Sequence, residues 1–256
     1  MQQAGPGLGV VGVERRLLIW FVIYADAVIA LILFLLGDLI FASLLGGLYS
    51  STATTVMLAR RLPTASSSAL QDMRSGIVLA TALMYLRIGV IIAVFNLDLA
   101  KQLSPALAVL LLFALVLAFL LHGRVQPGVR AAIGPGDYPS NPLELTAALI
   151  FAASFVLISL AANWLKAVIG PTGLFWLAGV IGIADVDPFV LNLAQGGIAG
   201  ASPPMLVIAV LIAASSNNLL KAAYALSFAG GRHGLGPAGA LAALGAAGFG
   251  IGAWLW

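Results

Sequence analysis

Charged side chains interrupt the apolar stretches of this sequence, and they are the first residues that could do chemistry. Five ionisable groups lie inside otherwise apolar stretches: Asp26, Arg87, Asp185, Asp187 and Lys221. A charged side chain at the centre of a bilayer costs at least about 2.5 kcal/mol, and it usually faces a partner or a cavity. Each of the five therefore needs a neutralising partner or a place in a site, and Asp26 fits either alternative equally well.

Asp185 and Asp187 directly precede Pro188. Proline lacks a backbone donor and disfavours helical geometry in the residue before it, so we predict a broken or kinked helix here. Hard cations such as Mg²⁺ prefer oxygen ligands of the kind that two carboxylates and freed carbonyl groups supply. The pair is a tentative metal site, and the alternative is that the aspartates neutralise Arg87 or Lys221. Both interpretations hold if the aspartates, the basic side chains and the metal form one network.

A second polar segment, residues 50–55, holds five hydroxyls in six positions after two glycines. Hydroxyls can bond to the carbonyls of their own helix, but this density favours an unwound or cavity-lining segment. Two asparagines near Lys221 add amides, which suit a cation or an anion equally. The predicted ion-binding residues are Ser51, Thr52, Thr54, Thr55, Arg87, Asp185, Asp187, Asn217, Asn218 and Lys221. No catalytic residue is predicted.

The composition explains why these groups are conspicuous. Of 256 residues, 62% are hydrophobic and 8% are charged, whereas a soluble domain is roughly a quarter charged. The chain has no cysteine, so disulfides and thiolate metal sites are excluded. Its basic residues are scattered rather than clustered, which argues against nucleic acid as a partner. We therefore expect the lipid bilayer to surround the chain.

The apolar stretches predict an all-α, polytopic membrane protein of about eight transmembrane helices, each of roughly 17 to 25 residues. No small-residue cleavage site follows the first stretch, so it is expected to be a retained helix rather than a signal peptide. The predicted spans are 17–36, 39–59, 76–97, 104–122, 143–163, 173–195, 204–229 and 237–256.

The two halves of the chain can be superposed in sequence with an offset of about 132 to 134 positions. Lys221 then falls on Arg87, and the hydroxyl run falls near the two aspartates. We predict two four-helix repeats, 1–125 and 143–256, separated by a cytoplasmic linker at 126–142. Each would contain a broken or kinked helix. Because each repeat would contain an even number of spans, they would be parallel.

Lysine and arginine in short loops predict the orientation. Seven on one side against three on the other favour both termini in the cytoplasm. The predicted cytoplasmic side carries Arg15, Arg16, Arg60, Arg61, Arg74, Arg124 and Arg130, and the outer side carries Lys101, Lys166 and Arg232. In the last span Gly245, Gly248 and Gly252 form a small-residue face typical of close helix contact, within one chain or across a homodimer.

Several of these motifs together resemble a known family. Residues 46–55 (GGLYSSTATT), followed by LARR at 58–61, resemble the membrane domain of unknown function found C-terminal to MgtC/SapB domains in many bacterial proteins. Further matches are MYLR at 84–87, NPLEL at 141–145, GIADVD at 182–187 and SNNLLK at 216–221. The MgtC/SapB domain itself is not in this sequence, and Asn218 stands where a threonine is expected. The resemblance implies a multi-pass bacterial inner-membrane protein and suggests magnesium physiology, but it implies no reaction.

The sequence contains no P-loop, nucleophile elbow, HExxH or dinucleotide motif, so we do not expect an enzyme. The first hypothesis is a transporter or channel for a small ion, with a divalent cation such as magnesium as substrate and no certain cofactor. An anion or zwitterion held by Arg87, Lys221 and the hydroxyl run is the direct alternative. A non-transporting membrane regulator that binds partner proteins is the third reading, and it predicts a closed charge network without a cavity.

Overall fold

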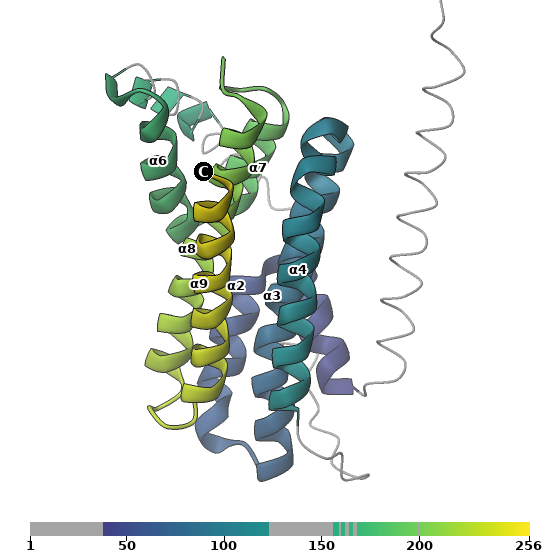
Figure 1. Cartoon of the computed structure of the whole chain (residues 1–256). Coiled ribbons are helices and arrows are strands. Elements are labelled where there is room, and N and C mark those ends of the chain that lie inside the picture. The colour runs from purple at the N-terminus through teal and green to yellow at the C-terminus, as the bar shows by residue number, and fades with distance from the viewer. Residues whose placement is uncertain (1–37, 123–155, 159, 162–163, 166–167, 199) are drawn as a thin grey trace, which may run out of the picture.

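The computed structural model describes residues 38–122, 156–158, 160–161, 164–165, 168–198 and 200–256. Its principal elements are α2 (Asp38–Arg61), η1 (Leu62–Thr64), α3 (Ser67–Phe95), α4 (Leu97–Leu121), α6 (Pro171–Ala184), α7 (Val186–Ala194), α8 (Pro203–Phe228) and α9 (Leu235–Leu255). They pack into an elongated helical bundle (Figure 1). The predicted all-α class is confirmed for these residues. The predicted span 17–36, Asp26 and the linker lie outside them.

Four of the described helices are long and apolar enough to cross a membrane: Ala69–Phe95, Leu97–Leu121, Pro203–Phe228 and Leu235–Leu255. The shortest has 21 residues, which corresponds to about 31 Å of helix and matches the hydrocarbon core. Large apolar side chains such as Leu112 and Phe119 of α4 are exposed, as expected for surfaces that face lipid. The membrane-protein prediction is thus supported, while the count of eight spans is not confirmed.

Side-chain contacts identify which helix ends lie together. The Arg74 Nε donates a hydrogen bond to the His233 carbonyl oxygen at 3.0 Å. This end of the bundle, called the basic end below, carries Arg60, Arg61, Arg74 and Arg232. At the opposite end the rings of Phe175 and Trp256 are 5.1 Å apart. The prediction that Arg232 lies across the membrane from Arg74 is therefore wrong.

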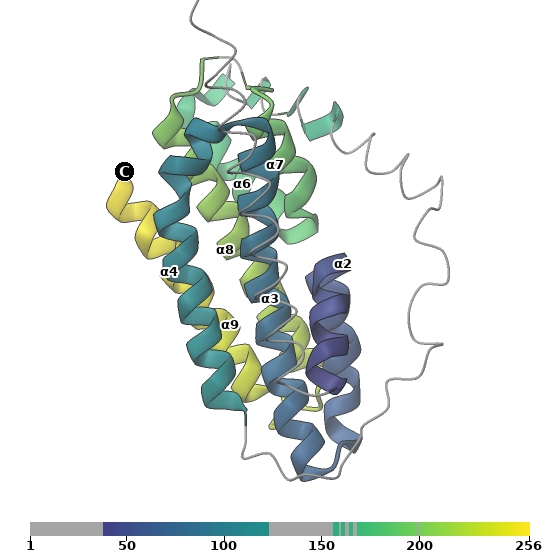
Figure 2. The same cartoon turned by 90° about the vertical axis from the view of Figure 1, so that its right-hand side faces the viewer.

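The reason is that α6 and α7 form a hairpin instead of the predicted crossing at 173–195. Helix α6 begins at the end of the bundle opposite the basic end. Helix α7 leads back to this opposite end, and α8 begins there (Figures 1 and 2). The two helices have 14 and 9 residues, about 21 and 14 Å, so neither alone spans a bilayer. Asp185, with φ −147° and ψ 124°, is the extended residue between them.

Helix α2 is also bent back on itself. Ser50 has φ −156° and ψ 106°, which interrupts the helix between an arm at 38–49 and an arm at 51–61. Figures 1 and 2 show both arms on the same side of the bundle's middle, with the chain returning to the basic end. The predicted span 39–59 therefore does not cross, because one extended residue reverses the helix direction.

These two hairpins approach the middle of the bundle from opposite ends. Helix α3 runs away from the basic end, whereas α8, its predicted counterpart, runs toward it (Figure 1). Parallel repeats would require both helices to run the same way, so the parallel relation is contradicted. A hairpin returns the chain to the side from which it came, which changes the number of crossings.

The glycine face of α9 is used inside the chain. A Cβ at Gly248 would overlap the Ser215 hydroxyl, and one at Gly245 would lie 3.1 Å from the Ser215 carbonyl oxygen. These glycines therefore let α9 pack closely on α8. The predicted homodimer would need another surface.

Candidate functional site

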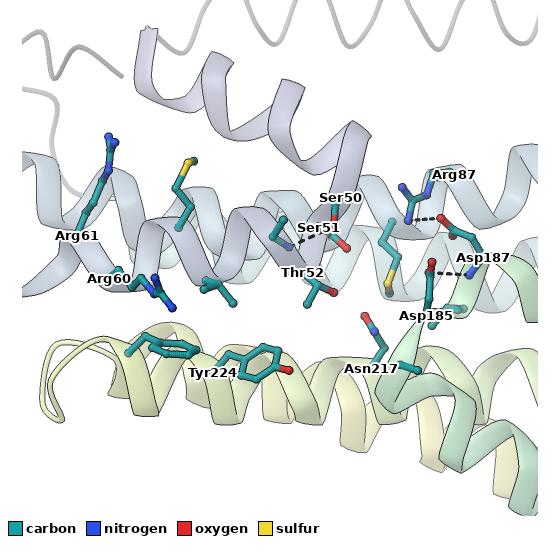
Figure 3. Close-up of a pocket in the computed structure, with 17 residues that line it drawn as sticks. Ser50, Ser51, Thr52, Arg60, Arg61, Arg87, Asp185, Asp187, Asn217 and Tyr224 are labelled. Carbon is teal, nitrogen blue, oxygen red and sulfur yellow. Dashed lines mark hydrogen bonds and ion pairs between the residues drawn. The ribbon is translucent and has the colours of Figure 1, made fainter. Parts of the chain in front are cut away.

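A cavity of about 960 Å³ lies where the two hairpin tips meet. Four segments enclose it: the second arm of α2, α3, α8 and the turn between α6 and α7 (Figure 3). Its lining residues are Ser50, Ser51, Thr52, Ala53, Val56, Met57, Arg60, Arg61, Met84, Arg87, Ala184, Asp185, Val186, Asp187, Asn217, Tyr224 and Phe228. The arginines of the α2 arm and Phe228 lie toward the basic end, so the cavity extends from that end to the hairpin tips.

The structure separates the ten predicted site residues into two groups. Six line the cavity: Ser51, Thr52, Arg87, Asp185, Asp187 and Asn217. The other four, Thr54, Thr55, Asn218 and Lys221, are buried behind it. The predicted residues that do not line the cavity lie on α2 and α8, beside predicted residues that do.

Arg87 and Asp187 form an ion pair on the cavity wall. The Arg87 Nη2 is 2.7 Å from Asp187 Oδ2, and the two side chains are 22% and 19% exposed. The predicted neutralisation of an aspartate by Arg87 is therefore observed. Asp187 Oδ1 is buried and has no hydrogen-bond partner among the described residues, so it can still accept a ligand.

Asp185 has a different environment. Its Oδ1 accepts the Asp187 backbone N–H at 3.2 Å, which caps the start of α7. The side chain is exposed on the cavity and makes no ion pair within the described part of the chain. Among the described residues, no group of three or more His, Cys, Asp or Glu could hold a metal. A cation at this pair would take its remaining ligands from hydroxyl, amide and carbonyl oxygens or from water.

Polar residues of α8 hold the α6–α7 hairpin in place. The Ser216 hydroxyl donates to the Gly179 carbonyl at 2.6 Å, and the Asn217 amide donates to the Gly182 carbonyl at 2.9 Å. The last four carbonyls of a helix lack partners within it, and Gly182 is one of these in α6, so the Asn217 bond satisfies a group that the break at Asp185 exposes. A Cβ at Gly182 would overlap the Ala213 carbonyl oxygen. Only glycine allows α6 to approach α8 this closely.

At the α2 tip, the side-chain hydrogen bonds of the described residues 50–55 stay within the helix. Ser50 Oγ accepts the Ala53 N–H at 3.2 Å and caps the second arm. The hydroxyls of Thr54 and Thr55 donate to the carbonyls of Ser50 and Ser51, at 3.0 and 2.8 Å. The structural reading of the hydroxyl run therefore holds for these two threonines, whereas the hydroxyl positions at 50–52 line the cavity.

Lys221 and Asn218 form a buried layer between α3 and α8. The Lys221 ammonium, fully buried, contacts Thr81 Oγ1 at 3.5 Å and Met84 Sδ at 3.2 Å. The Asn218 amide donates to the Tyr85 hydroxyl at 2.6 Å. Lys221 makes no ion pair with the carboxylates described here, so the predicted single network of buried charges does not include it.

Sequence reasoning missed part of the cavity. Arg60 stacks 4.8 Å from the centroid of the Phe228 ring, and both residues line the wall. Tyr224 and Phe228 follow Asn217 by 7 and 11 positions, the spacing of one helix face. That periodicity was the available signal, but an aromatic helix face is also typical of ordinary packing.

The chain was compared with known proteins. A family described as "Domain of unknown function (DUF4010)" matches residues 17–229. A protein of Aquifex aeolicus (strain VF5), described as "Uncharacterized protein", is 30% identical over 197 residues, which cover 75% of this chain and 83% of the relative. No solved structure matches. The chain therefore belongs to the DUF4010 family, the membrane domain that its motifs resemble.

Proposed function

We propose that this protein transports a small ion across the bacterial inner membrane through the cavity between its hairpin tips. The observation that carries the proposal is the meeting of two re-entrant hairpins, from opposite ends, at one charged cavity near the middle of the bundle. Non-helical backbone at membrane depth is tolerated where it is buried or lines a cavity. Broken helices around a midplane site are a recurring design of secondary transporters.

The two halves support alternating access if they are inverted repeats. Each half has a hairpin followed by two long helices. The breaks lie 135 positions apart (185 − 50), and the buried cations lie 134 apart (221 − 87). Hairpins that start at opposite ends fit an axis in the membrane plane. Each hairpin would then close the cavity toward one side of the membrane.

We place the basic end in the cytoplasm. Among described residues outside the bundle's middle, this end carries Arg60, Arg61, Arg74 and Arg232 against Lys101. Such an excess marks the cytoplasmic side. The cavity would then open inward. Trp256 would lie on the outer side, which replaces the predicted cytoplasmic C-terminus.

The deep end of the cavity, at the α6–α7 tip, favours a cation as the ion that binds there. Asp185 is exposed on the cavity, and Asp187 Oδ1 lacks a hydrogen-bond donor in the described structure. The Asn217 amide oxygen can add a neutral oxygen ligand. Magnesium is the first substrate to test, since it binds through few carboxylates and keeps several waters. The regulator hypothesis predicted no cavity, so the observed cavity counts against it.

Cation flux into proteoliposomes tests this function. Mg²⁺, Na⁺ and other cations are offered to protein reconstituted as wild type, Asp185→Asn and Asp98→Asn. Loss of the exposed Asp185 carboxylate is expected to reduce cation flux about tenfold or more. Asp98 is an exposed carboxylate paired with Lys101 at the end of α4 away from the basic end. Its replacement by asparagine should leave the cation flux unchanged. Absence of any cation flux from folded wild-type protein would refute the proposal.

A further inference from the structure

Two helices begin at the cavity, and they differ in charge. The first is the second arm of α2, residues 51–61, and the other is α7. A helix N-terminus carries about half a positive charge. At α7 this charge is met by Asp185 and Asp187, but the sequence of the α2 arm, STATTVMLARR, has no acidic residue. The α2 arm thus presents an uncompensated positive pole to the cavity.

Ser51 points to a ligand at this pole. It is only 3% exposed and lines the cavity, and Figure 3 shows it beside Ser50 at the tip. No hydrogen bond to a described residue uses its hydroxyl, in contrast to those of Thr54 and Thr55. Because this hydroxyl faces the cavity and is not used by the described protein groups, it is available to hydrogen-bond a ligand at the tip.

The cavity has room for more than a cation. A divalent ion with six waters occupies roughly 200 Å³ when each water takes about 30 Å³. The cavity is about 960 Å³. The remaining space extends along the α2 arm toward the basic end, where Arg60 and Arg61 line the wall. This part of the cavity is positive, whereas the Asp185 end is negative.

We propose that the α2 tip binds a small oxyanion while the α6–α7 tip binds the cation. The inference rests on the proposed transport function and makes it cotransport of ions of opposite charge. The N–H groups that begin the α2 arm and the hydroxyls of Ser51 and Thr52 hold the anion. Arg87 is already paired with Asp187. It therefore holds α7 against α3 and is not assigned as a ligand of the anion.

The test measures cation flux and binding on the full chain with matched anions. Acetate and succinate represent organic oxyanions, sulfate and phosphate represent inorganic ones, and chloride controls for ionic strength. The double variant Ser51→Ala/Thr52→Val is expected to lower oxyanion affinity about tenfold and leave Mg²⁺ affinity unchanged, because hydrogen bonds to an anion are lost. The control Thr54→Val removes a hydroxyl on the same arm that bonds only to backbone.

A second variant keeps the proposal testable if the double variant is unstable. Thr52→Asp gives the α2 arm the carboxylate that α7 has, and it should abolish oxyanion binding. Binding of succinate and acetate, or of sulfate and phosphate, with a matching increase in cation flux supports the site. Which pair is effective shows whether the anion is organic or inorganic. An equal response to chloride, or the same loss in Thr54→Val, overturns it. Cation flux that needs Asp185 but ignores every oxyanion refutes this inference alone, whereas no flux at all refutes the transport function.

Discussion

The two hairpins have similar shapes but are held differently. The α6–α7 hairpin is fixed from outside, by Ser216 and Asn217 of α8 and by the Arg87–Asp187 ion pair. Among the described residues 50–55, the side-chain hydrogen bonds are internal: Ser50 accepts from Ala53, and two threonines donate to carbonyls of their own helix. An element with few bonds to its surroundings moves at lower cost than an anchored one. We therefore expect the α2 hairpin to move at lower cost than the α6–α7 hairpin during transport.

The largest effect is expected where the anchored hairpin touches α8 backbone. Gly182→Val places a side chain on the Ala213 carbonyl, and overpacking of this kind should cost about 3 kcal/mol or more. A thermal melt in detergent measures the loss. Gly179→Ala is the matched control, since its nearest contact would be Ile212 at 3.9 Å. Equal melting temperatures for the two variants would show that the hairpin is not packed as described.

A smaller loss is expected from breaking the ion pair that joins α3 to α7. Arg87→Gln leaves Asp187 without its cation, at a cost of about 1 to 3 kcal/mol after allowance for partial exposure. The double variant Arg87→Gln/Asp187→Asn should recover part of that stability. Unfolding midpoints of these two variants and of the single variant Asp187→Asn complete a double-mutant cycle with the wild type, and strict additivity would argue against a direct interaction.

The smallest losses of stability are expected from single hydrogen-bonding side chains, one at each hairpin tip. Asn217→Ala removes the bond to the Gly182 carbonyl and should cost about 1 to 2 kcal/mol. Thr54→Val removes a hydroxyl that bonds to its own helix and should cost less than about 0.5 kcal/mol. Hydrogen exchange of the hairpin amides should rise in the first variant only. The reverse ranking would mean that α2 is the anchored hairpin.

The orientation can be tested without removing native thiols, because the chain has no cysteine. Arg232→Cys and Lys101→Cys should react with an impermeant maleimide from opposite sides of the membrane, with Arg232 on the cytoplasmic side. Arg74→Cys should label from the same side as Arg232, since Arg74 contacts His233. Labelling of Arg232 and Lys101 from one side would restore the topology expected from loop charges.

The sequence predicted the helical class, the polar segments and the break near Pro188, because composition and proline geometry are local properties. It did not predict that the broken helices turn back. That outcome depends on the dihedral angles of one residue, Ser50 or Asp185. Loop charges did not reveal the error. The loop at 195–202 was assigned to the wrong side of the bundle, and it contains no charged residue that could have corrected the assignment.

Helix phase limited the prediction of site residues. Thr52 and Thr55 are three positions apart in one hydroxyl run, yet Thr52 lines the cavity and Thr55 is buried. Arg87 and Lys221 align in sequence, but only Arg87 reaches a carboxylate. Residue type identified polar helices, whereas the side of each helix that faces the cavity follows from packing between helices.

The most direct measurement is cation flux through Thr52→Cys protein before and after reaction with a bulky thiol reagent. Thr52 lines the cavity, so the attached group should block it. We expect loss of Mg²⁺ flux on labelling of Thr52→Cys and retained flux on labelling of Lys101→Cys. Undiminished flux through fully labelled Thr52→Cys would show that the ion does not pass between the hairpin tips.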